Sequence, residues 1–167
     1  MKMDLIQPFV NSLDAVISET MGCTAQIADV TMDEGHYRRS GIAALVSVTG
    51  EIHGSVVLDM DNQAAQQAAT DLAGAPDTPT EDAVREAVCE LTNMVIGNAV
   101  TQLNDRGFKF KVHPPEVYAT EEGQGGTKET ETIVMRFETP KGTIYLNIAI
   151  RYNSRRARDS AAGVLTA

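Results

Sequence analysis

The chain has 167 residues and a formal net charge of −9; 43% of its residues are hydrophobic and 5% are aromatic. This length and composition predict one domain with an aliphatic core rather than a disordered chain. The negative charge argues against a nucleic acid partner, because binding a phosphate backbone requires clusters of Lys and Arg. No stretch approaches the ~18 apolar residues needed to cross a bilayer, and the two cysteines have no C-x-x-C spacing. We therefore expect a reduced, cytoplasmic protein with no membrane partner.

The first part of the chain predicts a helix and then a strand. Apolar side chains recur at helical spacing over residues 4–21, which predicts an amphipathic helix that ends at Gly22, with Pro8 tolerated in its first turn. A short strand is expected over residues 24–30, followed by a polar loop over residues 33–39.

A hairpin and a second helix are expected next. Residues 41–49 and 51–60 alternate as half-buried strands do, and they turn near Gly50. Asp61 is a suitable N-cap for a helix that continues through Ala73 and packs closely through its alanines.

A long third helix follows, and the rest of the chain is organised around it. Thr78 is expected to cap it, with Pro79 in the first helical position and Glu81 completing a capping box. The helix is expected to continue to a point before Gly107. Its apolar positions recur at helical spacing and predict a buried stripe: Val84, Val88, Leu91, Val95 and Ala99.

The opposite side of this helix has an unusual polar composition. Glu86, Glu90, Asn93 and Gly97 follow the same three- and four-residue spacing. Asn and Gly each cost roughly 0.5–1 kcal/mol in a helix interior relative to Ala. The face is therefore a candidate functional surface; the alternatives are an ordinary polar face and a Gly97 that allows close packing.

The C-terminal part predicts more strands. Residues 108–112 are expected to form a short strand. The Gly-rich residues 121–127 are expected to form a mobile hairpin loop rather than a phosphate loop, because a strand and not a helix is expected to follow. Residues 130–138 and 143–152 alternate as the two strands of a long hairpin.

Together these elements predict the α+β class. The expected architecture is a two-layer sandwich, in which an antiparallel sheet is covered on one face by long helices. Residues 1–152 would form the domain, and the basic residues 153–167 would form a C-terminal tail.

Three stretches resemble the CheC/CheX/FliY family of chemotaxis phosphatases, and the CheX branch in particular. Residues 90–99 resemble its signature helix, which has a Glu, two residues and then an Asn. Residues 8–22 resemble the opening helix, and His113-Pro114-Pro115 is also similar, so the likeness covers most of residues 3–152. Glu86 stands where the family usually has Asp or Ser. The first helix has no second signature, so one site is expected.

This resemblance implies the same fold and a phosphatase that hydrolyses the aspartyl phosphate of a CheY-like response-regulator receiver domain. It implies that Asn93 orients the attacking water and that Glu90 pairs with a receiver Lys. The residues suit these roles: an amide cannot act as a base but can donate and accept hydrogen bonds, and a carboxylate can pair with a cation. No cofactor of its own is expected, since the receiver supplies Mg²⁺. Glu86 and Gly97 are the expected partner contacts.

Other functions remain open at this stage. The same helix could belong to a non-catalytic receiver-binding or dimerisation module, and a homodimer joined through sheet edges is expected in either case. A metal site on Glu86 and Glu90 is disfavoured, because two carboxylates without His or further Asp make a poor ligand set. Cys89 lies beside Glu90, but no His or Lys partner is evident for a nucleophilic thiol.

Overall fold

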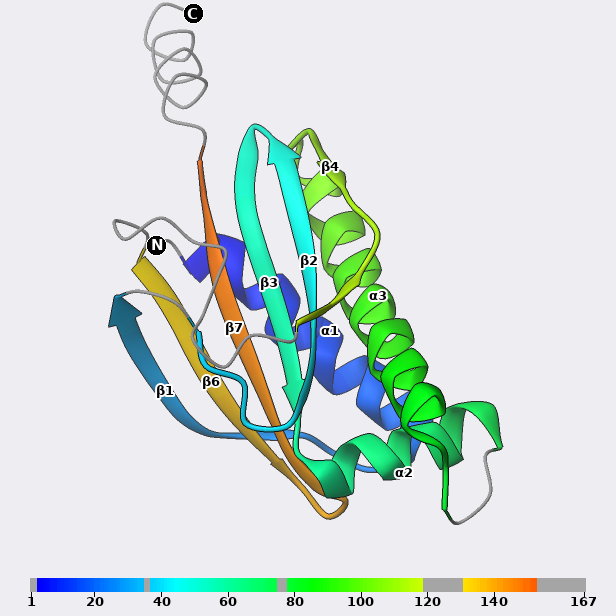
Figure 1. The fold of residues 1–167 in the computed structure, drawn as a ribbon. Helices are drawn as coiled ribbons and strands as arrows, with labels where there is room; N and C mark the ends of the chain where they lie inside the picture. Colours follow the sequence, from blue (N-terminus) through cyan, green and yellow to red (C-terminus); the bar gives the residue numbers. More distant parts are fainter. Residues whose placement is uncertain (1–2, 35–36, 75–77, 119–130, 153–167) are drawn as a thin grey trace, which may run out of the picture.

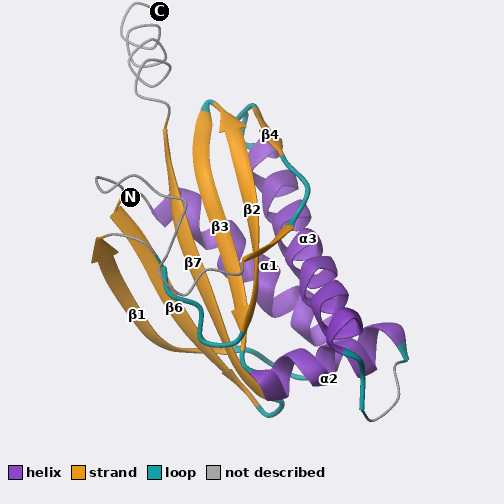
Figure 2. Cartoon of the chain, viewed as in Figure 1, coloured by secondary structure: helices purple, strands orange, loops and turns teal. Residues whose placement is uncertain are grey.

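The computed structural model describes residues 3–34, 37–74, 78–118 and 131–152. Seven strands form one antiparallel sheet in the order β1-β6-β7-β3-β2-β4, and β5 pairs with β2 as well. Two long helices, α1 and α3, lie on one face of this sheet, and the shorter α2 lies at one end of it (Figures 1 and 2). The predicted α+β two-layer architecture is confirmed. The elements are α1 (Met3–Met21), β1 (Gln26–Glu34), β2 (Ile42–Gly50), β3 (Ile52–Met60), α2 (Asn62–Ala73), α3 (Glu81–Asp105), β4 (Phe110–Val112), β5 (Glu116–Tyr118), β6 (Glu131–Thr139) and β7 (Gly142–Tyr152).

Both predicted hairpins are present, β2–β3 and β6–β7. Gly50 ends β2 with a φ of 127°, a conformation that L side chains rarely adopt, and a Cβ there would lie 2.9 Å from the Phe110 Cα. The β6–β7 turn packs against the start of α2. The Asp61 carboxylate accepts hydrogen bonds from the amides of Ala64 at 2.8 Å and Thr143 at 2.9 Å, so this residue both caps α2 and holds the second hairpin.

The main core lies between the sheet and the helices. Alternate residues of the four central strands point toward the helices, as period-two patterning requires. The buried strand residues of this core are Ala44, Val46, Val48, Ile52, Val56, Leu58, Met60, Ile133, Met135, Phe137, Ile144, Leu146, Ile148 and Ile150. A second, smaller core of Ala43, Val57 and Tyr118 lies on the other face of the sheet.

The structure corrects the position of Pro8. It lies inside α1 rather than in the first turn, because the helix begins at Met3. Proline has no N–H, so it cannot donate to the carbonyl of Asp4 four residues earlier. The guanidinium of Arg106, at the end of α3, donates to this carbonyl at 3.1 Å. A contact between two helices thus replaces the hydrogen bond that Pro8 cannot make.

The start of α3 also differs from the prediction. Thr80, not Thr78, is the N-cap: its hydroxyl accepts a hydrogen bond from the Ala83 amide at 3.1 Å, and the helix begins at Glu81. The expected capping box is therefore wrong. Glu81 and Asp82 instead place negative charge in the first turn, where the helix dipole favours it.

Two further boundaries change. β1 extends through residue 34 and includes the start of the expected polar loop, because it pairs with β6 along its full length. β5 was not predicted; it forms directly after the Pro114-Pro115 turn and pairs with β2.

The predicted loop at residues 121–127 and the predicted tail at residues 153–167 lie outside the described residues. Within the described ranges, no helix is long and apolar enough to span a bilayer.

Candidate functional site on helix α3

The outward face of α3 carries the predicted site residues. Glu86, Glu90, Asn93 and Gly97 are all exposed, while the apolar stripe of the helix is buried. The buried residues of α3 are Val84, Ala87, Val88, Leu91, Thr92, Val95, Ile96, Ala99 and Leu103. Positions 90 and 93 are neighbours on a helix surface, so the two side chains can reach one partner group together.

These polar groups have no partner of their own in the described part of the chain. Neither the Glu90 carboxylate nor the Asn93 amide makes a hydrogen bond or ion pair with a described residue. Arg85, the nearest cationic residue before Glu90 along the helix, lies five residues away and pairs with Glu81 at 3.6 Å and Asp82 at 3.9 Å. The Glu90 and Asn93 side chains are therefore available to a water molecule or a partner protein.

The helix beneath these groups is firmly held. The hydroxyl of Ser12 on α1 donates to the carbonyl of Val95 at 2.6 Å, and this hydrogen bond is buried. Thr92 is fully buried next to Asn93, and its hydroxyl donates to the Val88 carbonyl at 2.7 Å. Support of this kind fixes the direction of functional side chains on a rigid element. Ser12 therefore has a structural role, because it joins α1 to α3.

Gly97 is not required by the packing of the chain. Apart from its chain neighbours and the backbone of α3 itself, a Cβ at this position would meet no atom of the described residues within 4 Å. The alternative that Gly97 allows close packing inside the protein is therefore wrong. The packing of the described residues therefore does not explain its cost of about 1 kcal/mol relative to Ala.

The neighbouring groups do not add a nucleophile or a metal centre. Burial raises the pKa of the Cys89 thiol, which disfavours the reactive thiolate. Among the described residues, no group of three or more His, Cys, Asp and Glu side chains could hold a metal ion. His53 accepts a hydrogen bond from the Nε of Arg151 at 2.9 Å, and His113 bonds to Thr49 at 3.0 Å; both lie on strands or loops away from this face.

The family model for the chemotaxis phosphatase CheX matches residues 42–138, which is more than half of the chain and includes all of α3. The chain belongs to the CheX family. Its resemblance to CheX proteins, inferred from the signature helix, is thereby confirmed.

Solved structures of CheC-like and CheX proteins share the fold. A CheC-like superfamily protein from Shewanella sp. PV-4 is 24% identical with a TM-score of 0.78, over 90% of this chain and 99% of that one. Chemotaxis protein CheX from Vibrio vulnificus is 24% identical with a TM-score of 0.70, over 88% and 96%. CheX in the CheX–CheY–BeF₃–Mg²⁺ complex from Borrelia burgdorferi is 28% identical with a TM-score of 0.65, over 90% and 99%. No curated protein matches the chain significantly.

Proposed function

We propose that this protein hydrolyses the aspartyl phosphate of a CheY-like receiver domain, with α3 as its docking and catalytic helix. The observation that carries the proposal is the pair of exposed side chains, Glu90 and Asn93, that have no described partner on the rigid signature helix of a CheX-family chain. The Borrelia burgdorferi relative forms a complex with CheY, BeF₃ and Mg²⁺, which supports a receiver as the partner.

The roles of the two residues follow from their chemistry. Asn93 has no useful titrating group, but its amide can donate to and accept from one water and so hold that water in line with the phosphorus. Glu90 is a carboxylate that can pair with a cationic Lys of the receiver. Phosphoryl transfer requires mainly positioning and charge stabilisation, so a site without a nucleophile suffices when the substrate is already an activated acyl phosphate.

The receiver would supply the rest of the site. Mg²⁺ would be bound by the receiver, and this chain would contribute no cofactor. Glu86 would add a second carboxylate at the docking face, and Gly97 would let the partner backbone approach the helix without meeting a side chain. A receiver substrate would also imply a cytoplasmic location.

We further propose a homodimer joined through β1. β1 pairs only with β6 among the described strands, so its other edge has no strand partner in the part of the chain that the structure describes. Ile27, Val30 and Met32 are 48%, 53% and 59% exposed. Val30 and Met32 pair with core residues of β6, so their side chains point to the face of the sheet that the helices cover. They are nevertheless exposed, because β1 lies at the sheet edge farthest from α3 (Figure 1). An open edge with exposed apolar side chains favours pairing with a second copy. Light scattering that gives 18.0 kDa at micromolar concentration would exclude it.

The proposed activity is tested with the full chain and a panel of phosphorylated receivers from the same organism. We expect faster loss of the aspartyl phosphate than the spontaneous rate for at least one receiver in the presence of Mg²⁺. The double variant Glu90→Ala/Asn93→Ala should abolish the acceleration. A matched double variant, Glu19→Ala/Asn104→Ala, removes the same two side chains from other exposed helical positions and should keep it.

Two results would overturn the proposal. If no receiver loses phosphate faster than it does alone, the protein is not a receiver phosphatase, and binding without hydrolysis would identify the non-catalytic module instead. If both double variants lose activity equally, the face of α3 that carries Glu90 and Asn93 is not the catalytic site.

A further inference from the structure

Two buried polar side chains belong to the helices, whose other buried residues are apolar. Ser12 on α1 is 1% exposed, and Thr92 on α3 is 0% exposed. The other buried polar side chains among the described residues lie on strands: Asp59, Thr132 and Asn147. Burial of a hydroxyl is unfavourable unless the hydroxyl makes a hydrogen bond. The partners of Ser12 and Thr92 therefore indicate what these two residues do.

Both hydroxyls donate to carbonyls of α3. Thr92 donates within the helix to the Val88 carbonyl at 2.7 Å, and Ser12 donates across from α1 to the Val95 carbonyl at 2.6 Å. The proposed catalytic pair lies between these two carbonyls in the sequence. The two hydroxyls therefore bond to the inner side of the same turns that carry the proposed site on their outer side.

Of these two hydrogen bonds, the one from Ser12 joins separate elements. Hydrophobic burial has no preferred direction, so the aliphatic stripe of α3 holds the helix on the core without fixing its rotation. A hydrogen bond weakens steeply when its angle changes, so the bond to the Val95 carbonyl resists rotation. Val95 follows Asn93 by two residues, about 200° around the helix axis, and so lies on nearly the opposite side of α3. The bond thus acts on the turn from which Asn93 points outward.

A second hydrogen bond between α1 and α3 constrains the rotation less. The Arg106 guanidinium donates to the Asp4 carbonyl at 3.1 Å, and this hydrogen bond is exposed. A long arginine side chain can follow a rotation of its helix by changing rotamers, whereas the short Ser12 side chain cannot. Arg106 also lies eleven residues beyond Val95, roughly 16 Å along the helix axis, so it is far from the proposed site.

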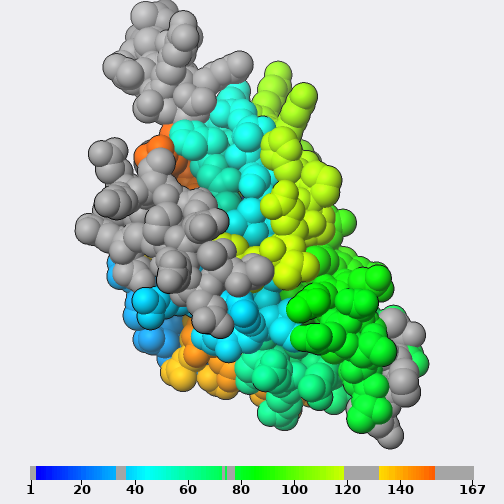
Figure 3. All heavy atoms as spheres, viewed as in Figure 1, coloured from blue at the N-terminus to red at the C-terminus, as the bar shows by residue number. Residues whose placement is uncertain are grey.

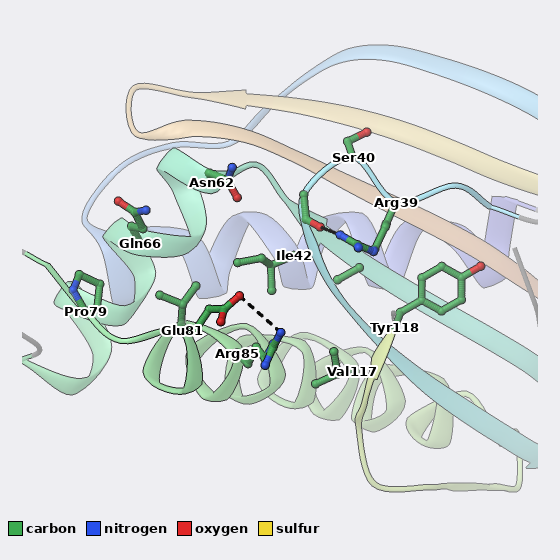
Figure 4. A pocket seen from close by; sticks show the side chains of 13 residues that line it. Arg39, Ser40, Ile42, Asn62, Gln66, Pro79, Glu81, Arg85, Val117 and Tyr118 are labelled. Carbon is green, nitrogen blue, oxygen red and sulfur yellow. Dashed lines mark hydrogen bonds and ion pairs between the residues drawn. The ribbon is translucent and has the colours of Figure 1, made fainter. Parts of the chain in front are cut away.

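The first turns of α3 also leave the rotation free, because they line a cavity of about 450 Å³. The cavity is formed where the segment before β2, the start of α2, the first turns of α3, and β5 come together (Figure 4). In the space-filling view these segments meet on the visible face of the molecule (Figure 3). A close-packed contact resists a shift of its neighbours, whereas empty space beside a helix does not. The rotation of α3 is therefore determined mainly where Ser12 holds it.

We propose that Ser12 is a positioning residue for the receiver phosphatase reaction, because its hydrogen bond to Val95 sets the direction in which Asn93 points. This inference rests on the proposed function. A rotation of α3 by about 10° would move an atom that lies about 6 Å from the helix axis by roughly 1 Å. A misplacement of about 1 Å can lower a rate about 100-fold. An exposed charge pair made by Glu90 tolerates such a shift, since its side chain is flexible, so docking should change less than hydrolysis.

A matched pair of variants on α1 tests this role in the full chain. Ser12→Ala removes the hydroxyl and leaves no donor without a partner. Single-turnover dephosphorylation per folded molecule should fall about tenfold, while affinity for a beryllofluoride-loaded receiver should change less than about twofold. Thr20→Val removes a hydroxyl that also donates at 2.6 Å, but to the Val16 carbonyl of the same helix, and should keep both rate and affinity. Equal rates in the two variants, or an equal loss of rate and affinity in Ser12→Ala, would overturn the role of Ser12.

Hydrogen exchange tests the same role without a receiver. In Ser12→Ala the amides of residues 90–99 should exchange about tenfold faster than in Thr20→Val, while the amides of the sheet should exchange equally in the two variants. Unchanged exchange over residues 90–99 would overturn the role of Ser12 whether or not the protein is a phosphatase. Equally faster exchange in the sheet would also overturn it, because Ser12 would then serve only global stability. A wild-type chain that dephosphorylates no receiver would instead overturn the proposed function.

Discussion

Two groups of polar side chains in this protein differ in their partners. On α3, Glu90 and Asn93 are exposed and have no partner among the described residues. On the sheet, Asp59 is fully buried and accepts hydrogen bonds from the hydroxyl of Tyr37 and from two backbone amides. A buried polar group must be satisfied, so the Asp59 group stabilises the fold. An exposed group that is held in place but has no partner is available for chemistry. Substitution of Asp59 or of a side chain that donates to it should therefore lower the stability of the fold. Substitution of Glu90 or Asn93 on α3 should instead lower activity.

The largest effect is expected for Asp59→Ala. The change leaves the half-buried Tyr37 hydroxyl and the amides of Ser40 and the buried Gly41 without their acceptor, at about 1–3 kcal/mol for each such group that stays out of water. We expect the free energy of unfolding, measured by urea denaturation, to fall by about 3 kcal/mol, with the rate per folded molecule unchanged. Asp105→Ala, at an exposed position, is the control and should change stability by less than about 0.5 kcal/mol. A loss below about 1 kcal/mol for Asp59→Ala would contradict the structural role.

Asn93→Ala should give the opposite result. Loss of the group that orients the water should lower receiver dephosphorylation about 100-fold. Affinity for the receiver should not change, because the interaction is made mainly in the transition state. Stability should be equal or slightly higher, since Ala is the better helix former. Single-turnover decay gives the rate, and titration with a beryllofluoride-loaded receiver gives the affinity. If the variant hydrolyses normally, or fails to bind, Asn93 does not act on the water.

Glu90→Lys should affect docking more than chemistry. It places a positive charge where a receiver Lys is expected, so affinity should fall about tenfold at low salt. The deficit should shrink as ionic strength rises, because salt screens exposed charges. Glu19→Lys on α1 has the same change in charge and should bind normally. Equal loss in both variants would mean that net charge, and not the Glu90 contact, determines docking.

Tyr37→Phe should cost about 1 kcal/mol at pH 7, the typical value of one hydrogen bond. Burial, and then the adjacent Asp59 carboxylate, raise the pKa of the Tyr37 phenol above its ordinary value of 10.0. The protonated phenol is therefore favoured in the folded state. Its stabilisation is fully present below pH 10 and decreases above pH 10 by up to ~1.4 kcal/mol per pH unit. The unfolding free energies of wild type and variant should converge between about pH 10 and 11. Parallel curves would contradict this.

The smallest effect is expected for Gly97→Ala. The new Cβ meets no atom of the described residues outside the backbone of α3, so the free energy of unfolding should rise by about 0.5–1 kcal/mol. If Gly97 faces the receiver, affinity should fall by a few fold despite the more stable helix. Unchanged affinity would exclude Gly97 from the docking surface. Chemical denaturation and receiver titration measure the two quantities.

The amino-acid sequence by itself determined the parts of this protein that depend on neighbours along the chain. Period-two alternation predicted both hairpins, and helical spacing predicted α3 with Glu90 and Asn93 on its exposed face. Each of these patterns depends only on residues that are close together in the sequence, within one or two helical turns or within one hairpin. The N-cap of α3 shows the limit of this approach, because Thr78 and Thr80 are both reasonable caps and only the helix start at Glu81 distinguishes them.

Only the tertiary structure decided the remaining features. Pro8 is tolerated inside α1 because Arg106, 102 positions later than Asp4, donates to the freed carbonyl. The cavity of about 450 Å³ beside the first turns of α3 likewise brings together groups from α2, α3, β5 and the segment before β2. No local pattern marks these partners. Their meeting is set by strand register and helix packing, which bring distant residues together only when the whole core forms.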